Sequence, residues 1–141
     1  MNMEKTILGN DLEICRILNG MWQVAGGHGQ IDSELAIQDM EKYQELGFTT
    51  WDLADIYGPA ESLIGGFSKK TKQNFQAFTK FVPNPGPMSN SIVTYYIDES
   101  LKKMNTECID LLQFHWWDYQ DSSYLDALQH LSKLQNEGKI K

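Results

Sequence analysis

The sequence has few cysteines and no long apolar run, and both shortages narrow the class of protein. Among 141 residues only Cys15 and Cys108 are cysteines, and they lie far apart without metal-ligand spacing. They fit two ordinary core thiols in a reducing compartment, so we expect a cytoplasmic protein without a metal site. No apolar run approaches the roughly 18 residues that a membrane span needs. We therefore expect no membrane segment.

Basic residues are also scarce. Twelve lysines and arginines face nineteen acidic residues, which gives a net charge of −7. This balance repels phosphate backbones and anionic membrane surfaces, so we expect no nucleic-acid partner and no membrane partner. Residues 1–14 lack an apolar stretch flanked by basic residues. For that reason we expect neither a signal peptide nor a transit peptide.

The sequence does contain a regular alternation of strand and helix patterns. Residues 5–15 predict a β-hairpin around a turn at 9–11. We then expect strands within 16–24, 48–54, 75–81 and 109–115, each followed by a helix, with helix starts near 32, 59, 89 and 121. Strands that alternate with helices indicate an α/β fold with a parallel sheet. The length suits one domain over residues 1–141.

Apolar spacing predicts which faces of these elements are buried. The predicted buried helix faces are Ala36, Met40 and Tyr43; Val93, Ile97, Leu101 and Met104; and Leu125, Leu128 and Leu131. Asp32 or Ser33 is expected to cap the first helix and Asp121 or Ser122 the last one. Strand 109–115 carries apolar residues on both faces, which is typical of a strand covered on both sides.

Polar side chains gather where three of the predicted strands end. Asp52, Lys80 and His115 share the parity of one face within their strands, and Tyr57 lies on the loop after Asp52. The carboxyl ends of parallel strands hold the ligands of barrels and open α/β sheets. Each residue alone has an ordinary explanation as a cap, a surface lysine, a core histidine or a packed ring. Together they favour one shared site.

Four motifs carry a resemblance to a known family. They are NGMWQ at 19–23, DLADIYGPAE at 52–61, TK at 79–80 and DLLQFHWWD at 110–118. With them the chain resembles the aldo-keto reductases from the hairpin to its last residue. The resemblance implies an N-terminal hairpin and the first four β/α units of a TIM (β/α)8 barrel, a truncated half-barrel. It also implies NADPH-dependent reduction of a carbonyl, an aldehyde or ketone, to an alcohol without a metal.

The resemblance implies a catalytic tetrad of Asp52, Tyr57, Lys80 and His115. Hydride addition leaves negative charge on the carbonyl oxygen, so a general acid must lie against it, here Tyr57. A free phenol holds its proton tightly near neutral pH, and the ammonium of Lys80 would favour the phenolate. Asp52 would hold that ammonium in place. His115 would orient the substrate oxygen or assist proton transfer.

Three tryptophans at loop positions, Trp22, Trp116 and Trp117, are candidates for a substrate wall, and packing beneath a loop is the alternative. The loop AGGHG around His28 lacks the G-x-G-x-x-G form of a phosphate cradle. In the family the cofactor-binding groups come from later strands and loops. The cofactor-binding residues would therefore lie beyond Lys141, and they are unknown for this chain.

Two functions follow from these expectations. The first is a reductase of a small-molecule carbonyl that requires the C-terminal half, since a full barrel takes about 250 residues. The alternative is a catalytically inactive remnant or interaction module that retains the tetrad. The outer strands of a half-barrel would have unpaired edges, so we expect self-association or pairing with a C-terminal half-barrel. Sugars, aliphatic aldehydes and aromatic carbonyls all stay open as substrates.

Overall fold

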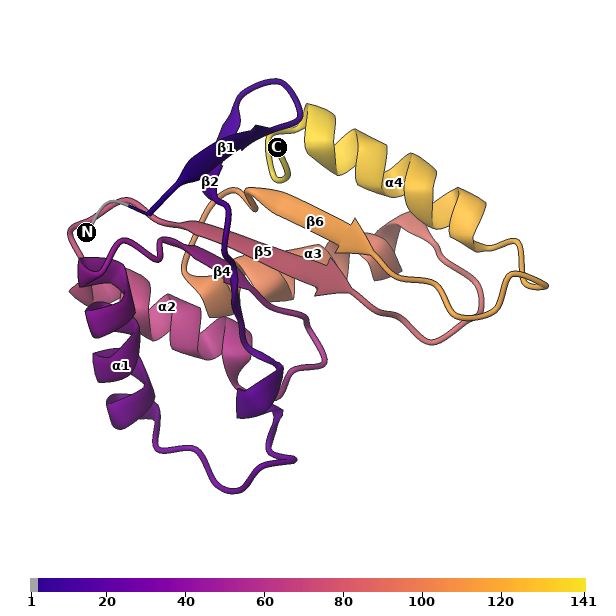
Figure 1. The fold of residues 1–141 in the computed structure, drawn as a ribbon. Helices are drawn as coiled ribbons and strands as arrows, with labels where there is room; N and C mark the ends of the chain where they lie inside the picture. Colours follow the sequence, from indigo (N-terminus) through magenta and orange to yellow (C-terminus); the bar gives the residue numbers. More distant parts are fainter. Residues whose placement is uncertain (1–2) are drawn as a thin grey trace.

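The computed structural model describes residues 3–141 and begins with an antiparallel hairpin (Figure 1). Strands β1 (Lys5–Leu8) and β2 (Leu12–Cys15) pair across a turn in which Gly9 has a φ of 65°. This positive φ suits glycine. The hairpin prediction is confirmed. The expectation that the chain has neither a signal peptide nor a transit peptide rests partly on Met1 and Asn2, which lie outside the described residues.

Four parallel strands form the main sheet, and they follow one another in chain order. They are β3 (Asn19–Gly20), β4 (Thr50–Asp52), β5 (Gln76–Phe81) and β6 (Leu111–Phe114). With the helices between them, they confirm the α/β prediction. The strand predicted over 16–24 is wrong in its second half, because Trp22–Ala25 forms a 3-10 helix, η1. The Met21 N–H still bonds the Asp52 carbonyl before the chain leaves the sheet.

Four α-helices follow the strands and pack on one another in chain order. They are α1 (Ser33–Glu45), α2 (Ala60–Lys70), α3 (Asn90–Met104) and α4 (Tyr124–Asn136). The Asp32 carboxylate caps α1 as predicted, accepting the N–H groups of Glu34 and Leu35. The predicted cap of α4 is wrong. Asp121 instead accepts the Ser123 N–H before the helix begins, and Ser123 makes no side-chain capping bond.

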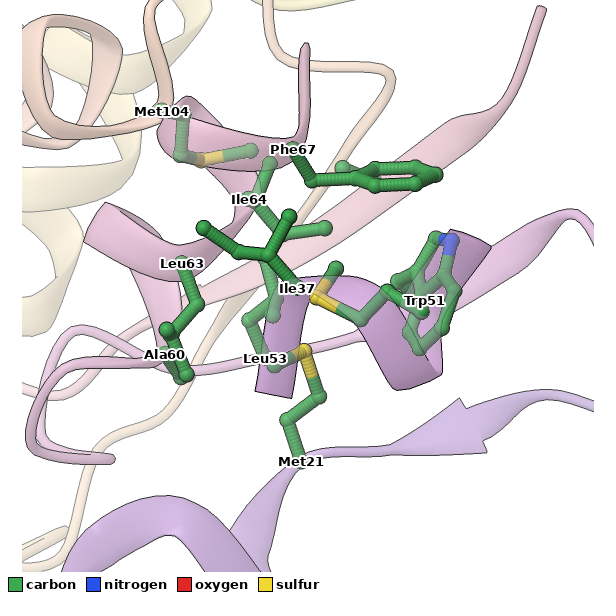
Figure 2. Close-up of a cluster of buried hydrophobic side chains, with 11 residues drawn as sticks. Met21, Ile37, Trp51, Leu53, Ala60, Leu63, Ile64, Phe67 and Met104 are labelled. Atoms are coloured by element: carbon green, nitrogen blue, oxygen red, sulfur yellow. The ribbon is translucent and has the colours of Figure 1, made fainter. Parts of the chain in front are cut away.

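Two clusters of buried side chains lie between the sheet and the helices. The first core cluster, shown in Figure 2, comprises Met21, Ile37, Met40, Trp51, Leu53, Ala60, Leu63, Ile64, Phe67, Ala77 and Met104. The second comprises Phe81, Met88, Val93, Ile97, Leu101, Ile109, Trp116, Ala127, Leu131, Leu134 and Ile140. All four residues of the predicted α3 face are buried, which confirms that prediction.

Two predicted helix faces are only partly right, since Met40 and Leu131 are buried as predicted but their companions are not. Helix α1 buries Ile37, Met40 and Gln44, whereas Tyr43 is 49% exposed. Helix α4 buries Ala127, Leu131 and Leu134, whereas Leu125 and Leu128 are exposed. In both helices a small or polar residue occupies the packed side. The apolar spacing therefore pointed to a neighbouring stripe.

Strand β6 departs from its prediction in a different way. It is an outer strand of the sheet among the described residues, with Gln113 exposed and its three other residues only partly buried. Leu112 and Phe114 pack against the second core cluster, so one face is covered by helices. The expectation that β6 is buried on both faces is wrong, because no strand of residues 3–141 covers the other side.

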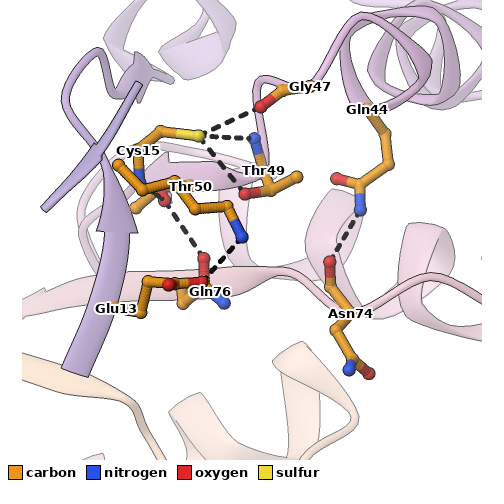
Figure 3. A network of polar contacts seen from close by, with 9 residues as sticks. Glu13, Cys15, Gln44, Gly47, Thr49, Thr50, Asn74 and Gln76 are labelled. Carbon is orange, nitrogen blue, oxygen red and sulfur yellow. Dashed lines mark hydrogen bonds and ion pairs between the residues drawn. The ribbon is translucent and has the colours of Figure 1, made fainter. Parts of the chain in front are cut away.

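Polar contacts fasten the hairpin to the first residues of β4 and β5 (Figure 3). The Cys15 N–H donates to Thr50 Oγ1 at 2.9 Å, and that hydroxyl donates to Gln76 Oε1 at 3.2 Å. The Cys15 thiol donates to the Gly47 carbonyl at 3.0 Å. Thr50 and Gln76 begin β4 and β5, so the hairpin closes the amino end of the strands. The carboxyl end stays open.

Candidate active site

An ion pair joins β4 and β5 at their carboxyl ends. Lys80 Nζ donates to Asp52 Oδ1 at 2.8 Å and to the Leu53 carbonyl at 2.7 Å. The side chains of Lys80 and Asp52 are 15% and 30% exposed. A pair so far withdrawn from water interacts more strongly than a surface pair. Two of the three residues that share strand parity, Asp52 and Lys80, therefore do meet at the carboxyl end of the sheet, which we call the rim.

Tyr57 lies in the turn that leaves β4. Its N–H donates to the Ala54 carbonyl at 3.1 Å, and its own carbonyl accepts the Ala60 N–H at 3.0 Å. Lys80 Nζ is 5.2 Å from the centroid of the Tyr57 ring. The edge of Trp22 meets that ring, with centroids 5.1 Å apart. Asp52, Lys80 and Tyr57 thus lie together.

Gly58 lets this turn approach η1 closely. Its φ is 51°, and a Cβ at this position would lie 3.3 Å from the Ala25 backbone. A larger residue would be strained by its backbone conformation and crowded by that neighbour. The glycine after Tyr57 therefore holds the ring near Trp22.

His115 stands at the start of the loop after β6. Its N–H donates to the Phe81 carbonyl at 2.9 Å, one residue beyond Lys80. Its ring stacks on Trp117, with centroids 4.1 Å apart and planes 28° apart. Within residues 3–141, no hydrogen bond joins the imidazole to Asp52, Tyr57 or Lys80. The backbone places His115 at the rim, and its ring is held by Trp117.

The three tryptophans separate into two groups. Trp22 and Trp117 are 55% and 61% exposed at the rim, where a ligand could touch them. Trp116 is 4% exposed and packs in the second core cluster. Its indole N–H donates to the carbonyls of Asp118 and Asp121 at 2.6 and 3.1 Å. This burial agrees with the packing alternative for Trp116 and does not suit a substrate wall.

Two further carboxylates lie behind the rim, and the sequence patterns did not indicate them. Asp55 Oδ2 accepts the Val82 N–H at 3.1 Å. Glu61 is 2% exposed, and its Oε1 accepts the Thr79 hydroxyl at 2.8 Å. Burial raises the pKa of Asp55, the Val82 N–H opposes that rise, and the charge of Glu61 adds to it. Glu61 shares a helix face with buried Ile64, which is the signal that could have revealed it.

The N-terminus of α1 and the cavity beside it do not suit the phosphates of a dinucleotide. The N-terminus of α1, a common place for phosphate, is occupied by Asp32, which takes two of its N–H groups. A cavity of about 710 Å³ lies beside it, lined among others by Asp32, Asp39 and Trp51, and includes none of the four tetrad residues. Two carboxylates in its wall would repel an anion. Phosphate binding must come from elsewhere.

In residues 3–141, no three His, Cys, Asp or Glu side chains gather where they could hold a metal ion. No helix in the same range is both long and apolar enough to cross a bilayer. Cys15 and Cys108 are both free thiols.

Sequence comparison gives a family and several curated relatives. The model of the aldo/keto reductase family matches residues 16–141. A 6-dehydroglucose reductase of Agrobacterium fabrum is 32% identical over 131 residues, covering 80% of this chain and 43% of that protein. An aryl-alcohol dehydrogenase of Pestalotiopsis microspora is 28% identical over 139 residues, covering 87% and 35%. The chain thus spans less than half the length of both.

Solved structures show the same fold. An aldo-keto reductase from Bacillus halodurans, in its holo form, gives a TM-score of 0.80 at 24% identity, covering 99% of this chain and 48% of that one. A Bombyx mori aldo-keto reductase in complex with NADP gives 0.77 at 19% identity, covering 99% and 49%. The chain therefore has the fold of about half of a TIM-barrel protein, which confirms the half-barrel prediction.

Proposed function

The chain belongs to the aldo-keto reductase family, and from this premise we propose that it forms the proton-donating half of an NADPH-dependent carbonyl reductase. The product would be the alcohol of an aldehyde or ketone. The observation that carries this proposal is the group of Asp52, Lys80 and Tyr57 at one rim, with the ammonium 5.2 Å from the phenol ring centroid. We also propose that residues 1–141 form a single domain and that the protein is cytoplasmic, where Cys15 and Cys108 would stay reduced.

Each member of the tetrad has a distinct task in this proposal. Tyr57 gives its proton to the carbonyl oxygen as negative charge develops there. The positive charge of Lys80 favours the phenolate that remains. Asp52 accepts a hydrogen bond from that ammonium, which fixes its position and keeps it charged. His115 orients the carbonyl oxygen or assists the proton transfer from the other side of the rim.

Exposed rings would flank the substrate. Trp22 touches the Tyr57 ring and Trp117 touches the His115 ring, so one indole would lie beside the acid and another beside His115. Aromatic walls of this kind suit flat or ring-shaped molecules. The two relatives are named for 6-dehydroglucose and for aryl alcohols. An aromatic aldehyde and an oxidised sugar are therefore the first substrates to try.

The hydride donor would be held by protein outside residues 3–141, since neither the N-terminus of α1 nor the cavity beside it suits its phosphates. We propose that a C-terminal half-barrel pairs with the outer strands and brings the NADPH site with it. One pairing already begins there, because Ile109 and Ile140 form a parallel bridge beside β6. The Ile109 N–H donates to the Lys139 carbonyl, and the Lys141 N–H donates to the Ile109 carbonyl, both at 3.0 Å.

A binding module without turnover is the second candidate. The outer strands β3 and β6 favour it, because each offers an edge to a partner chain or to a second copy. The same edges serve the reductase when a C-terminal half-barrel occupies them. The two candidates therefore differ in whether the completed assembly binds NADPH.

An NADPH titration separates these candidates. We would measure tryptophan quenching of this chain alone and after mixing with the C-terminal half of a homologous reductase. We expect saturable binding in the micromolar range for the mixture, as for typical enzyme–ligand pairs. Aldehyde reduction, followed through loss of NADPH absorbance, should accompany it. If the mixture forms a stable complex but binds no NADPH, the result would support the binding module and exclude the reductase.

The acid is tested within the active mixture. Tyr57→Phe should abolish reduction and leave NADPH affinity unchanged, because the ring remains and only the proton donor is lost. Tyr95→Phe, at an exposed position on α3, is the matched control and should retain full activity. Turnover that persists in Tyr57→Phe would refute the assigned acid.

A further inference from the structure

The turn that carries Tyr57 is tied to β5 by Asp55 as well as by Lys80. The Leu53 N–H donates to the Phe78 carbonyl of β5 at 2.8 Å, and the Asp55 N–H donates to the Lys80 carbonyl at 3.1 Å. The parallel pairing thus continues beyond the last residue of β4. Two residues later the chain has turned, and Tyr57 stands at the rim.

The side chain of Asp55 continues this pairing where the backbone cannot. Its Oδ2 accepts the Val82 N–H at 3.1 Å, just beyond the last residue of β5. Val82 is 9% exposed, so its N–H has little access to water and needs a protein acceptor. The carboxylate therefore replaces a strand carbonyl. It fixes the separation between the turn of Tyr57 and the strand of Lys80.

The same carboxylate has an unusual neighbour. Asp55 Oδ1 and Glu61 Oε2 are both buried and, among the described residues, neither accepts a hydrogen bond. The charged groups that act on Asp55 are Glu61 from α2 and Lys103 from α3. Lys103 Nζ lies 3.7 Å from Glu61 Oε2, so two carboxylates share one cation that does not bond either closely. Asp55 therefore binds a proton more readily than a solvated aspartate does.

We propose that Asp55 is a positioning residue that fixes the Tyr57 turn to β5, and that its burial beside Glu61 sets the pH at which this attachment changes. The part that concerns catalysis rests on the proposed role of Tyr57. A hydrogen bond to an ionised carboxylate is about twice as strong as one to a neutral acceptor. The Val82 hydrogen bond is therefore strongest when Asp55 is charged. Because burial, and then the charge of Glu61, raise the pKa of Asp55, the closed turn binds a proton more tightly than an open one, so the turn as a whole is favoured as pH falls through that pKa.

An NMR titration of the full chain tests both parts without cofactor. The Val82 amide proton should follow one titration whose midpoint lies above the value of about 3.9 for an ordinary aspartate. The ring resonances of Tyr57 should follow the same midpoint, because the turn that carries the ring responds to the protonation of Asp55. Glu61→Gln removes the neighbouring charge and keeps an oxygen for Thr79, so the midpoint should fall. Asp55→Asn should abolish the Val82 titration.

The matched control is Asp39→Asn, which removes an exposed carboxylate paired with Lys42. It should leave the Val82 titration unchanged. A Val82 amide that does not titrate, or a midpoint that Glu61→Gln leaves in place, would overturn the pH-sensitive attachment. Tyr57 resonances that ignore the Val82 midpoint would overturn the positioning role.

These measurements remain decisive in two unfavourable cases. If Asp55→Asn does not fold, the unmodified chain and Glu61→Gln still give both midpoints. If the chain proves to have no reductase activity, the titrations are unaffected, because they use neither NADPH nor substrate. Failure of the proposed function and failure of this attachment are therefore distinguishable.

Discussion

The two parts of the rim are held in different ways. The inner rim, Asp52, Tyr57 and Lys80, lies on β4 and β5, and the Lys80 ammonium has two acceptors within 2.8 Å. The outer rim, His115 and Trp117, follows β6, and the ring of His115 is held by an exposed stack at 4.1 Å. Strands β4 and β5 each have a neighbouring strand on both sides, and they position the Lys80–Asp52 ion pair without the outer rim. The ring of His115 depends instead on its stack with Trp117.

The inner rim is also backed by a close helix contact, and breaking it should have the largest effect. A Cβ on Gly65 of α2 would lie 2.0 Å from the Lys103 carbonyl of α3. Backbone cannot move aside as a side chain can, so Gly65→Ala should lower the free energy of unfolding by about 2–3 kcal/mol. Urea unfolding followed by tryptophan fluorescence measures it.

The neighbouring glycine provides the control for this prediction. A Cβ on Gly66 would meet only the end of the Ile37 side chain, at 2.7 Å. That methyl group can rotate away, so Gly66→Ala should change stability by less than about 1 kcal/mol. Equal losses in the two variants would mean that α2 and α3 are not in close contact behind the inner rim.

The ion pair gives the next largest effect. Lys80→Met leaves Asp52 partly buried without its cation, which should lower the free energy of unfolding by about 2 kcal/mol, less than for a fully buried pair. The Tyr57 ring resonances should shift, and those of His115 should not. Lys42→Met, which breaks an exposed pair with Asp39, should cost less than about 1 kcal/mol. Similar losses for both lysines would show that the inner rim is no better held than the surface.

Sequence patterns predicted the order of the elements better than their contacts. The face of α3 was found because Val93, Ile97, Leu101 and Met104 are all apolar and all packed. The face of α4 was missed because Leu125 and Leu128 are exposed while Ala127 is buried. A helix that packs with alanine on one side has no distinct stripe to read. Burial of β6 depended on a neighbouring strand, which its own residues do not reveal.

The same limit applies to the candidate site. Strand parity correctly brought Asp52 and Lys80 together, because alternation along adjacent strands is a local rule. Asp55 and Glu61 were not found, since their burial arises where the turn meets α2 and β5. Acidic residues are usually exposed, so composition gives no warning of such a pair. Only their tertiary contacts distinguish Asp55 and Glu61 from ordinary exposed acidic residues.

The outer rim gives the smallest expected change in stability and the sharpest local signal. Trp117 is 61% exposed, so Trp117→Ala should alter the free energy of unfolding by about 0.5 kcal/mol or less. The His115 ring resonances should nevertheless move strongly, because the stacked indole is their nearest aromatic neighbour. Tyr119→Ala removes a more exposed ring that contacts Tyr124, and it should leave His115 unchanged. Unchanged His115 resonances in Trp117→Ala would mean that something other than the stack holds this ring, and the difference between the two rims would disappear.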